Sequence, residues 1–558
     1  MQEQDGAEDD VEQGRRHDQA VDGCCRDPYA RDVPHQPREA GGGEPAQRHR
    51  PGGGPAQHHE EERHDGDRDE RHRGETESSH DRYPLPPSRL SGGLAGRADA
   101  TLPPVPRASF TSLGCRLNHT EAANWAGQFA GKGYTIVPWG DPTDLAVINT
   151  CSVTHRAEAH CRNTVRRALR HSPEAFVVVA GCYAQSGLDA LREIPGVDMI
   201  VGTEFKETFP DYLDRPRKLP EPVVLHSARI SRHEFEVPST GRYDSTRANL
   251  KVQDGCDFFC SFCIIPYTRG RERSRRFDDL VREAGELAGA GYRELVLTGV
   301  NIGRYRSGGR TLADVADRLE EIPGVRRIRI TSIEPTTVED RLLERMAERG
   351  ALCRYLHLPV QSGDDGVLAG MGRRYTFRDY LEFAERAVEK VPGLGLGTDV
   401  IVGFPGETED AFRRTCDRLE ALPFAYYHVF SYSSRAGTRA ASVPGHLPPE
   451  VVAERSRTLR ELSDRRRDAF ARRHLGRRVE VLFEQQDRSG RWTGLTDSYL
   501  RVGVVSAEPL ENCIREVRVT RVAEDTPGLA VGTLVSERRP PAGIAERSEA
   551  KRPSRLPA

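Results

Sequence analysis

Short hydrophobic runs alternate with amphipathic segments along most of the chain, from about residue 108 to residue 434. In the first part of this region, three apolar runs are typical of buried parallel strands, and the segments between them have the spacing of amphipathic helices. The expected strands are Ala108–Leu113, Leu145–Asn149 and Phe176–Ala180, and two of the expected helices are Thr120–Gly131 and Ala157–Arg170. This alternation predicts an α/β fold with a small doubly wound sheet.

From about residue 240 the same alternation occurs six times. The expected strands are Ala248–Val252, Glu294–Thr298, Arg327–Thr331, Tyr355–Val360, Gly397–Gly403 and Tyr426–Tyr432, and the helices between them include Asp278–Ala290, Val338–Ala347 and Phe377–Val391. Six β/α units are too few to close an eightfold barrel, so we expect a partial (β/α)6 barrel. Its chemistry should lie in the loops at the C-terminal ends of the strands.

The pattern changes again after residue 475, where short strands with alternating polarity predict a small all-β barrel. Three of these strands are expected at Val479–Phe483, Leu500–Val504 and Ile514–Val519. The predicted organisation is a disordered extension (1–105), a doubly wound domain (106–217), the partial barrel (240–472), the small β-barrel (475–538) and a disordered tail (539–558).

Composition changes this picture mainly at the N-terminus. Residues 1–105 are rich in Gly, Pro and charged residues and poor in large apolar ones, so they bury too little apolar surface to offset chain entropy. Their histidines and the Cys24-Cys25 pair leave metal binding open as an alternative to a solvated tail. A further hypothesis is that the working protein begins near Val105 and that the preceding residues are translated upstream sequence.

The chain has 558 residues, a formal net charge of −3 and twelve cysteines. No run approaches the roughly 18 apolar residues of a membrane helix, and an apolar secretory signal is missing from the N-terminus. We therefore expect a cytoplasmic protein without a membrane partner, whose cysteines are reduced and available for metal binding or catalysis.

Three cysteines lie in a C-x3-C-x2-C loop, Gly255-Cys-Asp-Phe-Phe-Cys-Ser-Phe-Cys263, after the first strand of the predicted partial barrel. Cys256, Cys260 and Cys263 can hold three irons of a [4Fe-4S] cluster and leave the fourth iron free for the amine and carboxylate of S-adenosylmethionine (SAM). The alternative is a structural zinc site, which normally needs a fourth protein ligand at comparable spacing.

Three more cysteines, Cys115, Cys151 and Cys182, each follow a different predicted strand of the doubly wound sheet. The C-terminal ends of parallel strands meet at one crevice. These thiols could therefore hold a second cluster with an open iron, although three unrelated buried cysteines would have the same spacing. Cys161 is interpreted as incidental.

Other strand ends of the partial barrel provide candidate SAM contacts. These are Gly299 and Asn301 after the second strand, Glu334 after the third, and Val402 and Gly403 at the end of the fifth. Glycine allows a backbone to approach a ligand closely.

A basic stripe between Arg455 and Arg478 contains ten arginines against three acidic residues and leads into the small β-barrel. Such a stripe is typical of phosphate-backbone binding, although many charged helices are only solvated. The candidate RNA-binding residues are Arg465, Arg466, Arg472, Arg473, Arg477 and Arg478. Further arginines near the C-x3-C-x2-C loop (Arg269, Arg271, Arg273, Arg275 and Arg276) and the pair Arg373-Arg374 are interpreted as part of the same surface.

Several long motifs occur in an order that resembles the radical SAM methylthiotransferases. They are Ser112-Leu-Gly-Cys-Arg-Leu-Asn118, Asn149-Thr-Cys-Ser-Val153, Gly181-Cys-Tyr-Ala-Gln185, Leu358-Pro-Val-Gln-Ser-Gly-Asp-Asp365 and Thr398-Asp-Val-Ile-Val-Gly-Phe-Pro-Gly-Glu-Thr408. The resemblance spans about residues 107–537. It implies two [4Fe-4S] clusters, one on Cys115, Cys151 and Cys182 and one on Cys256, Cys260 and Cys263, SAM as cofactor, and a C-terminal TRAM barrel that binds tRNA.

Within this family, Leu113-Gly-Cys-Arg-Leu-Asn118 and Thr331-Ser-Ile-Glu-Pro335 are most similar to the enzymes that act at C2 of N6-threonylcarbamoyladenosine at position 37 of tRNA. Alternatives are N6-isopentenyladenosine at the same position and an aspartate of a ribosomal protein. A non-enzymatic zinc RNA-binding protein is a more distant alternative. The resemblance also implies an electron donor such as flavodoxin or ferredoxin and a sulfur donor.

Overall fold

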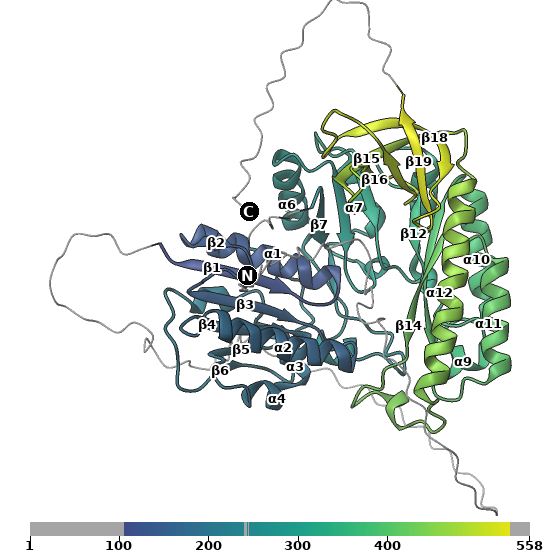
Figure 1. Cartoon of the computed structure of the whole chain (residues 1–558). Helices are drawn as coiled ribbons and strands as arrows, with labels where there is room; N and C mark the ends of the chain where they lie inside the picture. Colours follow the sequence, from purple (N-terminus) through teal and green to yellow (C-terminus); the bar gives the residue numbers. More distant parts are fainter. Residues whose placement is uncertain (1–104, 239–240, 242, 244, 536–558) are drawn as a thin grey trace, which may run out of the picture. The chain divides into compact units, whose positions relative to one another are not determined.

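The computed structural model describes residues 105–238, 241, 243 and 245–535 (Figure 1). The predicted disordered extension and tail lie almost entirely outside the described residues. No helix in the described part of the chain is both long enough and apolar enough to span a bilayer.

The first described segment is a parallel sheet of six strands in the order β2-β1-β3-β4-β5-β6. Its elements are β1 (Arg107–Ser112), α1 (Arg116–Gly131), β2 (Thr135–Val137), β3 (Leu145–Thr150), α2 (His155–His171), β4 (Phe176–Gly181), α3 (Cys182–Ser186), α4 (Leu188–Arg192), β5 (Met199–Val201) and β6 (Val223–Leu225). The three predicted strands are β1, β3 and β4. The pattern missed the other three, which have only three residues each.

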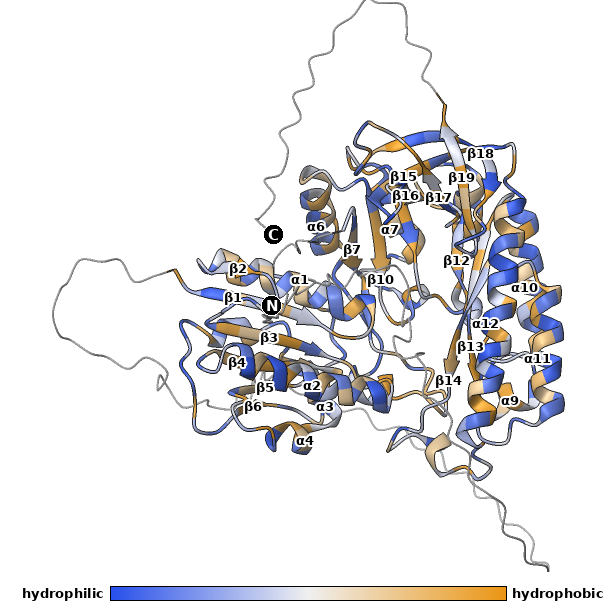
Figure 2. Cartoon of the chain, viewed as in Figure 1, coloured by the Kyte–Doolittle hydropathy of each residue, from blue (hydrophilic) through white to orange (hydrophobic). Residues whose placement is uncertain are grey.

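Both faces of this sheet are covered, as a doubly wound arrangement requires. Trp125 and Phe129 of α1 pack with Val147 on one face, whereas Val165 of α2 packs with Ile148 on the other. Figure 2 shows that β3 is hydrophobic over most of its length, as expected for a strand that is buried on both sides. The strand order reverses between β1 and β3, and in such sheets this switch point is where ligands bind.

The second segment contains six parallel strands in chain order and a short antiparallel pair, β8 with β9. It comprises β7 (Arg247–Lys251), β8 (Gln253–Asp254), α5 (Ile265–Thr268), β9 (Arg273–Ser274), α6 (Phe277–Gly289), β10 (Glu294–Thr298), α7 (Leu312–Glu320), β11 (Arg327–Ile330), α8 (Asp340–Ala347), β12 (Tyr355–His357), α9 (Asp365–Gly370), α10 (Phe377–Lys390), β13 (Gly395–Val402), α11 (Glu409–Ala421), β14 (Tyr426–Ser431) and α12 (Pro449–Arg472).

These strands form two three-stranded parallel sheets, β7-β10-β11 and β12-β13-β14. Single parallel bridges, Ile328 with Leu352 and Ser332 with His357, link β11 to the β12 region. One hydrophobic core runs beneath both sheets. The α/β prediction for this region is confirmed, but β12 ends at His357, three residues earlier than expected.

The last segment is a small closed barrel with the strand order β15-β16-β17-β19-β18, as predicted. Its strands are β15 (Arg478–Gln486), β16 (Trp492–Leu495), β17 (Arg501–Val504), β18 (Ile514–Val522) and β19 (Leu529–Leu534). Buried arginines of β11 bind its backbone: Arg327 donates to the Leu495 carbonyl oxygen at 2.8 Å, and Arg329 donates to that of Thr496 at 2.9 Å.

Candidate functional site

The C-x3-C-x2-C loop follows β8 and makes a sharp turn at Gly255. This residue has φ of +70°, and a Cβ atom would lie 2.1 Å from the Arg271 carbonyl oxygen, so only glycine fits. Phe259 also has a positive φ, of 50°, which is strained for a bulky residue and typical of functional loops. The Phe258 amide donates to Cys256 Sγ at 3.4 Å. Burial raises the pKa of the Cys256 thiol to about 12.

Arg373 connects this loop to one of the predicted SAM contacts. Its guanidinium donates to Cys260 Sγ at 3.3 Å, to the Glu334 carboxylate and to Tyr375 Oη. Burial raises the pKa of Glu334, while the charge of Arg373 opposes that shift. Glu334 is therefore brought beside the cysteine loop, as expected from its position at a strand end.

Gln253 is a site residue that the sequence did not single out. Its amide nitrogen donates to the Asp254 and Gly255 carbonyl oxygens at 3.0 and 2.7 Å, and its amide oxygen accepts from the backbones of Val300 and Asn301 at 2.9 and 3.0 Å. This buried side chain thus joins the cysteine loop to the loop after β10. A glutamine in a strand gives no signal of such a role before the strand order is known.

The loop after β10 carries two predicted SAM contacts, Gly299 and Asn301. A Cβ atom at Gly299 would lie 2.9 Å from the Gln253 carbonyl oxygen, so this glycine permits close packing of two strand ends. The Asn301 amide oxygen accepts from the Glu334 backbone at 3.3 Å and from Thr337 Oγ1 at 3.0 Å. Its amide nitrogen is buried and has no hydrogen-bond partner among the described residues, which leaves a donor for a ligand.

The remaining two predicted SAM contacts lie at the end of β13. Val402 is fully buried, and its carbonyl oxygen accepts from the Tyr432 amide. Gly403 has φ of +78°, packs against Val452 of α12 and donates its amide to Glu407 at 2.8 Å. The next residue, Phe404, belongs to an apolar cluster that Phe262 of the cysteine loop also contacts.

The other three cysteines follow three neighbouring strands of the first sheet: Cys115 precedes α1, Cys151 follows β3, and Cys182 begins α3 after β4. Cys115 and Cys151 thus flank the switch point between β1 and β3. Gly114 has φ of +99°, and a Cβ atom there would lie 2.7 Å from Cys151 Sγ. The structure therefore brings the first two loops into direct contact.

The surroundings of this triad fit a sulfur-rich metal group. Burial and the neighbouring thiols of Cys182 and Cys115 raise the pKa of Cys151 well above its ordinary value, so a positive metal centre would stabilise the thiolates. Buried oxygen atoms of Ser112, Asn149 and Ser152 have no hydrogen-bond partner among the described residues. The serine hydroxyls are donors that could serve the sulfides of a cluster.

Cys161 contacts Cys151 of this triad, which its position within a predicted helix did not indicate. Its sulfur accepts a hydrogen bond from the Cys151 amide at 3.3 Å and lies 3.5 Å from the Cys151 carbonyl oxygen. It is fully buried under α2, and burial raises its pKa to about 12. Cys161 therefore supports the backbone of a candidate ligand.

The three sulfur atoms of each triad lie farther apart than the ligand atoms of a single metal ion. Among the described residues, the only group of three or more His, Cys, Asp or Glu ligand atoms that all lie within 4.8 Å of one another is that of His357, Asp399 and His428. Tetrahedral zinc with Zn–S bonds of about 2.3 Å needs sulfur atoms roughly 3.8 Å apart. The thiol donors and their spread fit a polynuclear iron–sulfur group better than zinc.

A buried ionic network joins the two triads. The Arg269 guanidinium donates to Glu121 at 3.0 Å, to Asp254 at 2.9 Å and to the Asn118 side chain. Asp254 lies two residues before Cys256, and Asn118 lies three residues after Cys115 and contacts its sulfur. Lys206 and Lys251 complete the network at 2.9 and 3.1 Å from Glu121.

The charges in this network depend on one another. Although burial lowers the pKa of an arginine, nearby Cys182, Glu121 and Asp254 together raise the pKa of Arg269. Burial raises the pKa of Glu121, but Arg269, Lys206 and Lys251 outweigh it and hold that pKa well below its ordinary value. Arg269 therefore lies close to the thiols of the first triad while it is bound to the base of the second loop.

Replacing Arg269 with glutamine is expected to destabilise the protein strongly. Removing one partner of a buried ion pair costs about 3–5 kcal/mol, since the remaining charge stays buried without compensation. The urea midpoint of anaerobically purified protein should fall clearly. Arg271→Gln is the matched control, because Arg271 is half exposed and lies 3.5 Å from Asp257. Equal midpoints for the two variants would contradict the role of the network.

The interpretation of the arginines near the cysteine loop as a phosphate-binding surface is wrong for the buried ones. Arg269, Arg275 and Arg373 are almost fully buried and hold Glu121, Glu283 and Glu334, respectively. The sequence shows their charge but not their partners, which lie on α1, on α6 and in the loop after β11. They are internal counter-ions.

The fold exposes some arginines of the predicted basic stripe and gives others internal partners. Arg465, Arg472, Arg473, Arg477 and Arg478 are exposed. Arg466 instead donates to the carbonyl oxygens of Glu420 and Leu422, at the end of α11. Arg455 is buried against Glu407 at 2.7 Å.

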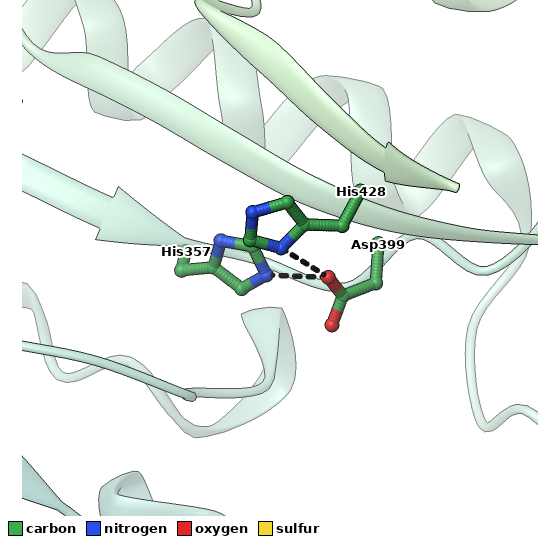
Figure 3. Close-up of side chains that lie close together, drawn as sticks. All are labelled: His357, Asp399 and His428. Atoms are coloured by element: carbon green, nitrogen blue, oxygen red, sulfur yellow. Dashed lines mark hydrogen bonds and ion pairs between the residues drawn. The ribbon is translucent and has the colours of Figure 1, made fainter. Parts of the chain in front are cut away.

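The group of His357, Asp399 and His428 was not found from the sequence. Figure 3 shows both imidazoles directed at the Asp399 carboxylate. His357 Nε2 lies 2.8 Å and His428 Nδ1 lies 3.2 Å from the same oxygen, Oδ1. The three residues come from β12, β13 and β14, and Asp399 lies 42 positions after His357 and 29 before His428, so only strand register could reveal them.

Comparison with known proteins matches the two segments that carry the thiol triads to known families. Residues 250–419 match the radical SAM superfamily, and residues 107–202 match a family described as uncharacterized protein family UPF0004. The C-x3-C-x2-C triad lies in the first match and the strand-end triad lies in the second.

Complete relatives match most of the chain. The threonylcarbamoyladenosine tRNA methylthiotransferase MtaB of Bacillus subtilis (strain 168) is 36% identical over 74% of this chain and 93% of its own length. MtaB of Aquifex aeolicus is 34% identical over 71% and 96%, and the tRNA-2-methylthio-N(6)-dimethylallyladenosine synthase of Cereibacter sphaeroides is 36% identical over 74% and 96%. Enzymes of this kind use SAM and [4Fe-4S] clusters, which fits the two thiol triads. The chain therefore belongs to the radical SAM methylthiotransferase family.

Proposed function

We propose that this protein transfers a methylthio group to C2 of N6-threonylcarbamoyladenosine at position 37 of tRNA, with SAM as both methyl donor and source of a 5′-deoxyadenosyl radical. The observation that carries the proposal is the pair of thiol triads joined through Arg269. Two such centres fit a reaction that needs both a radical and a source of sulfur. The relatives named MtaB support the choice of substrate.

In this proposal the triads have separate roles. Cys256, Cys260 and Cys263 would hold the cluster that supplies an electron to SAM, and Cys115, Cys151 and Cys182 would hold the one that presents sulfur. A radical route is chemically suitable because the C–H bond at C2 of adenine resists ordinary acid–base activation. The protein's own contribution is to orient the groups and to exclude water.

Several side chains have contacts suited to binding SAM. Gly299 lets the loop after β10 approach the cysteine loop, and the buried Asn301 amide nitrogen is a donor that a ligand could use. Glu334 is held beside Cys260 by Arg373. Val402 and Gly403 would contribute backbone groups at the end of β13.

We propose that residues 475–538, the segment that contains the closed barrel, are a TRAM domain that binds tRNA, with residues 106–217 and 240–472 as the other two domains. The exposed arginines Arg465, Arg472, Arg473, Arg477 and Arg478 would contact phosphates. Arg466 is excluded from this set because it binds backbone carbonyl groups. An electron donor such as flavodoxin or ferredoxin and a sulfur donor would be further partners.

The second candidate substrate is N6-isopentenyladenosine at position 37. It is favoured by the relative named a dimethylallyladenosine synthase, which is as identical to this chain as the MtaB of Bacillus subtilis. The sequence favours the first candidate through Leu113-Gly-Cys-Arg-Leu-Asn118 and Thr331-Ser-Ile-Glu-Pro335.

Nucleoside mass spectrometry of tRNA tests the choice between them. Deleting the gene in its host should remove 2-methylthio-N6-threonylcarbamoyladenosine and leave N6-threonylcarbamoyladenosine in its place. Reintroducing the unaltered gene should restore the product, whereas a Cys151→Ala gene should not. Loss of the 2-methylthio-isopentenyl nucleoside instead would transfer the assignment to the second substrate, and unchanged tRNA would contradict both.

A further inference from the structure

The group of His357, Asp399 and His428 is built by the register of three parallel strands. Asp399 pairs directly with His428 across β13 and β14, and His357 pairs with Gly397, two residues before Asp399. Residues two apart on a strand face the same side, so all three side chains share one face of the sheet. At Gly397 a Cβ atom would lie 2.6 Å from Tyr426 Oη and 2.9 Å from His357 Nδ1. Glycine at this position therefore makes room for the group.

The hydrogen bonds define which atoms of the group are donors. Burial raises the pKa of Asp399, but the neighbouring His357 and His428 outweigh it and keep that pKa well below the ordinary value, so the carboxylate is ionised and accepts from both imidazoles. Burial lowers the pKa of His428. A neutral His428 that donates from Nδ1 has an acceptor lone pair at Nε2.

Two acceptor atoms of the group remain for a ligand. In the described part of the chain, no residue donates a hydrogen bond to Asp399 Oδ2 or to His428 Nε2. The side chains of Asp399 and His428 are 24% and 20% exposed, respectively, so neither is sealed in the core. Partly exposed acceptors of this kind can receive hydrogen bonds from ligands that carry N–H or O–H donors.

The group lies beside residues from the other two segments. Tyr355, two residues before His357, stacks on Tyr499 of the small barrel with ring centroids 4.5 Å apart. Tyr499 has a positive φ, of 69°, which is a strained conformation for an aromatic residue. Arg116, which follows the candidate ligand Cys115, donates to Tyr499 Oη at 3.4 Å. Tyr355 and Tyr499 thus connect the group to Arg116 in the first turn of α1, which Cys115 precedes.

We propose that Asp399 Oδ2 and His428 Nε2 accept hydrogen bonds from the N–H groups of the substituent on N6 of the target adenine, and that this site reads the modification. The inference rests on the proposed function. An N6-threonylcarbamoyl group carries two N–H donors in its urea linkage, and an N6-isopentenyl group retains only the one on N6. A pair of acceptors therefore discriminates between the two substrates in favour of the first.

The same residues could be ligands of a metal ion, since their atoms lie within 4.8 Å of one another. The geometry favours the hydrogen-bonded site, because both imidazoles point at one oxygen and not at a common point between the three side chains. A metal is accordingly one of the outcomes that the experiment separates.

Binding of anticodon stem-loop RNAs to the anaerobic holoenzyme tests the proposal. Three synthetic RNAs carry N6-threonylcarbamoyladenosine, N6-isopentenyladenosine or adenosine at position 37, and fluorescence anisotropy gives each dissociation constant. The unaltered protein should prefer the threonylcarbamoyl RNA to the isopentenyl RNA, which offers one N–H donor fewer. His428→Phe should reduce this preference about 10-fold, as for one lost hydrogen bond.

Conservative and control variants separate recognition from folding. His428→Gln should regain most of the preference, because the glutamine amide oxygen can take the place of Nε2 as an acceptor. His171→Gln, at the C-terminal end of α2, should leave all three dissociation constants unchanged. A ratio between two RNAs that differ only at N6 does not respond to a general loss of folded protein.

Each alternative outcome has a distinct meaning. An undiminished preference in both His428→Phe and Asp399→Asn would overturn the site and leave the proposed function standing. One non-iron metal ion per chain that disappears in His428→Phe would identify a metal site instead. Equal binding of all three RNAs by the unaltered protein would contradict both the site and the proposed substrate.

Discussion

Replacing Cys256 with alanine is expected to abolish the formation of 5′-deoxyadenosine from SAM. The thiol lies at the turn that Gly255 makes against Arg271 and is one of only three cysteines in that loop. Two thiolates cannot hold a cluster that needs three, so SAM loses the metal centre that cleaves it. Liquid chromatography of anaerobic reactions with SAM and dithionite should show a loss of about 10³-fold or more, to background.

The iron content gives a second measure of the Cys256→Ala variant. Reconstituted unaltered protein should contain about eight irons per chain, and the variant should contain about four, because the other triad is untouched. Cys513→Ala, in a loop of the small barrel, is the matched control and should keep both values. If Cys256→Ala still produces 5′-deoxyadenosine at the rate of the control, the assignment of this triad to SAM cleavage is wrong.

Replacing Cys151 with alanine is expected to abolish methylthiolation and to leave the cleavage of SAM intact. Cys151 is buried at the end of β3 and contacts Gly114 of the neighbouring loop, far in sequence from the C-x3-C-x2-C motif. The variant should still cleave SAM to 5′-deoxyadenosine but should form no methylthiolated nucleoside, and its iron should again fall to about four per chain. Nucleoside mass spectrometry of the treated tRNA and iron analysis give the two readouts.

A Cys161→Ala variant is the control for the Cys151 experiment. Its sulfur accepts from the Cys151 amide but is not a predicted ligand, so the iron content should stay near eight. Cleavage of SAM that fails together with methylthiolation in Cys151→Ala would show that the two triads do not act separately. Full methylthiolation by that variant would show that this triad is not required for the reaction.

The Arg269 network links the segments that carry the two thiol triads. Arg269 and Lys251 bind Glu121 of α1 on one side and Asp254 of β8 on the other. The charges are buried, so a change in the spacing of the two segments would leave ions without partners, at a cost of several kcal/mol. The network therefore holds the two cysteine loops in one relative arrangement.

Local patterns in the sequence predicted the parts of the fold that depend on neighbouring residues. Four or more consecutive apolar residues identified β3 and β4, and the spacing of Cys256, Cys260 and Cys263 predicted a cluster site in their loop. The three-residue strands β2, β5 and β6 were missed, because so short a run does not distinguish a strand from a loop. Their places in the sheet come from pairing with longer strands.

Residues that act through distant partners were not predicted. Gln253 resembles any polar residue of a strand until its contacts with Val300 and Asn301 are known. The arginines near the cysteine loop have the composition of an RNA-binding surface, yet Arg269 and Arg275 are internal counter-ions. Charge can be counted along a chain, but burial depends on which carboxylates the fold brings into contact.

The close spacing of Cys256, Cys260 and Cys263 and the order of the motifs predicted one thiol triad and the family from residue types alone. The alternation of strands and helices added Cys115, Cys151 and Cys182 as cysteines at three strand ends. The facing of His357, Asp399 and His428, and the link that Arg269 makes between the two cysteine loops, became visible only in the fold. Strand register and burial arise from contacts between segments far apart in the chain. Such contacts leave no local pattern in either segment.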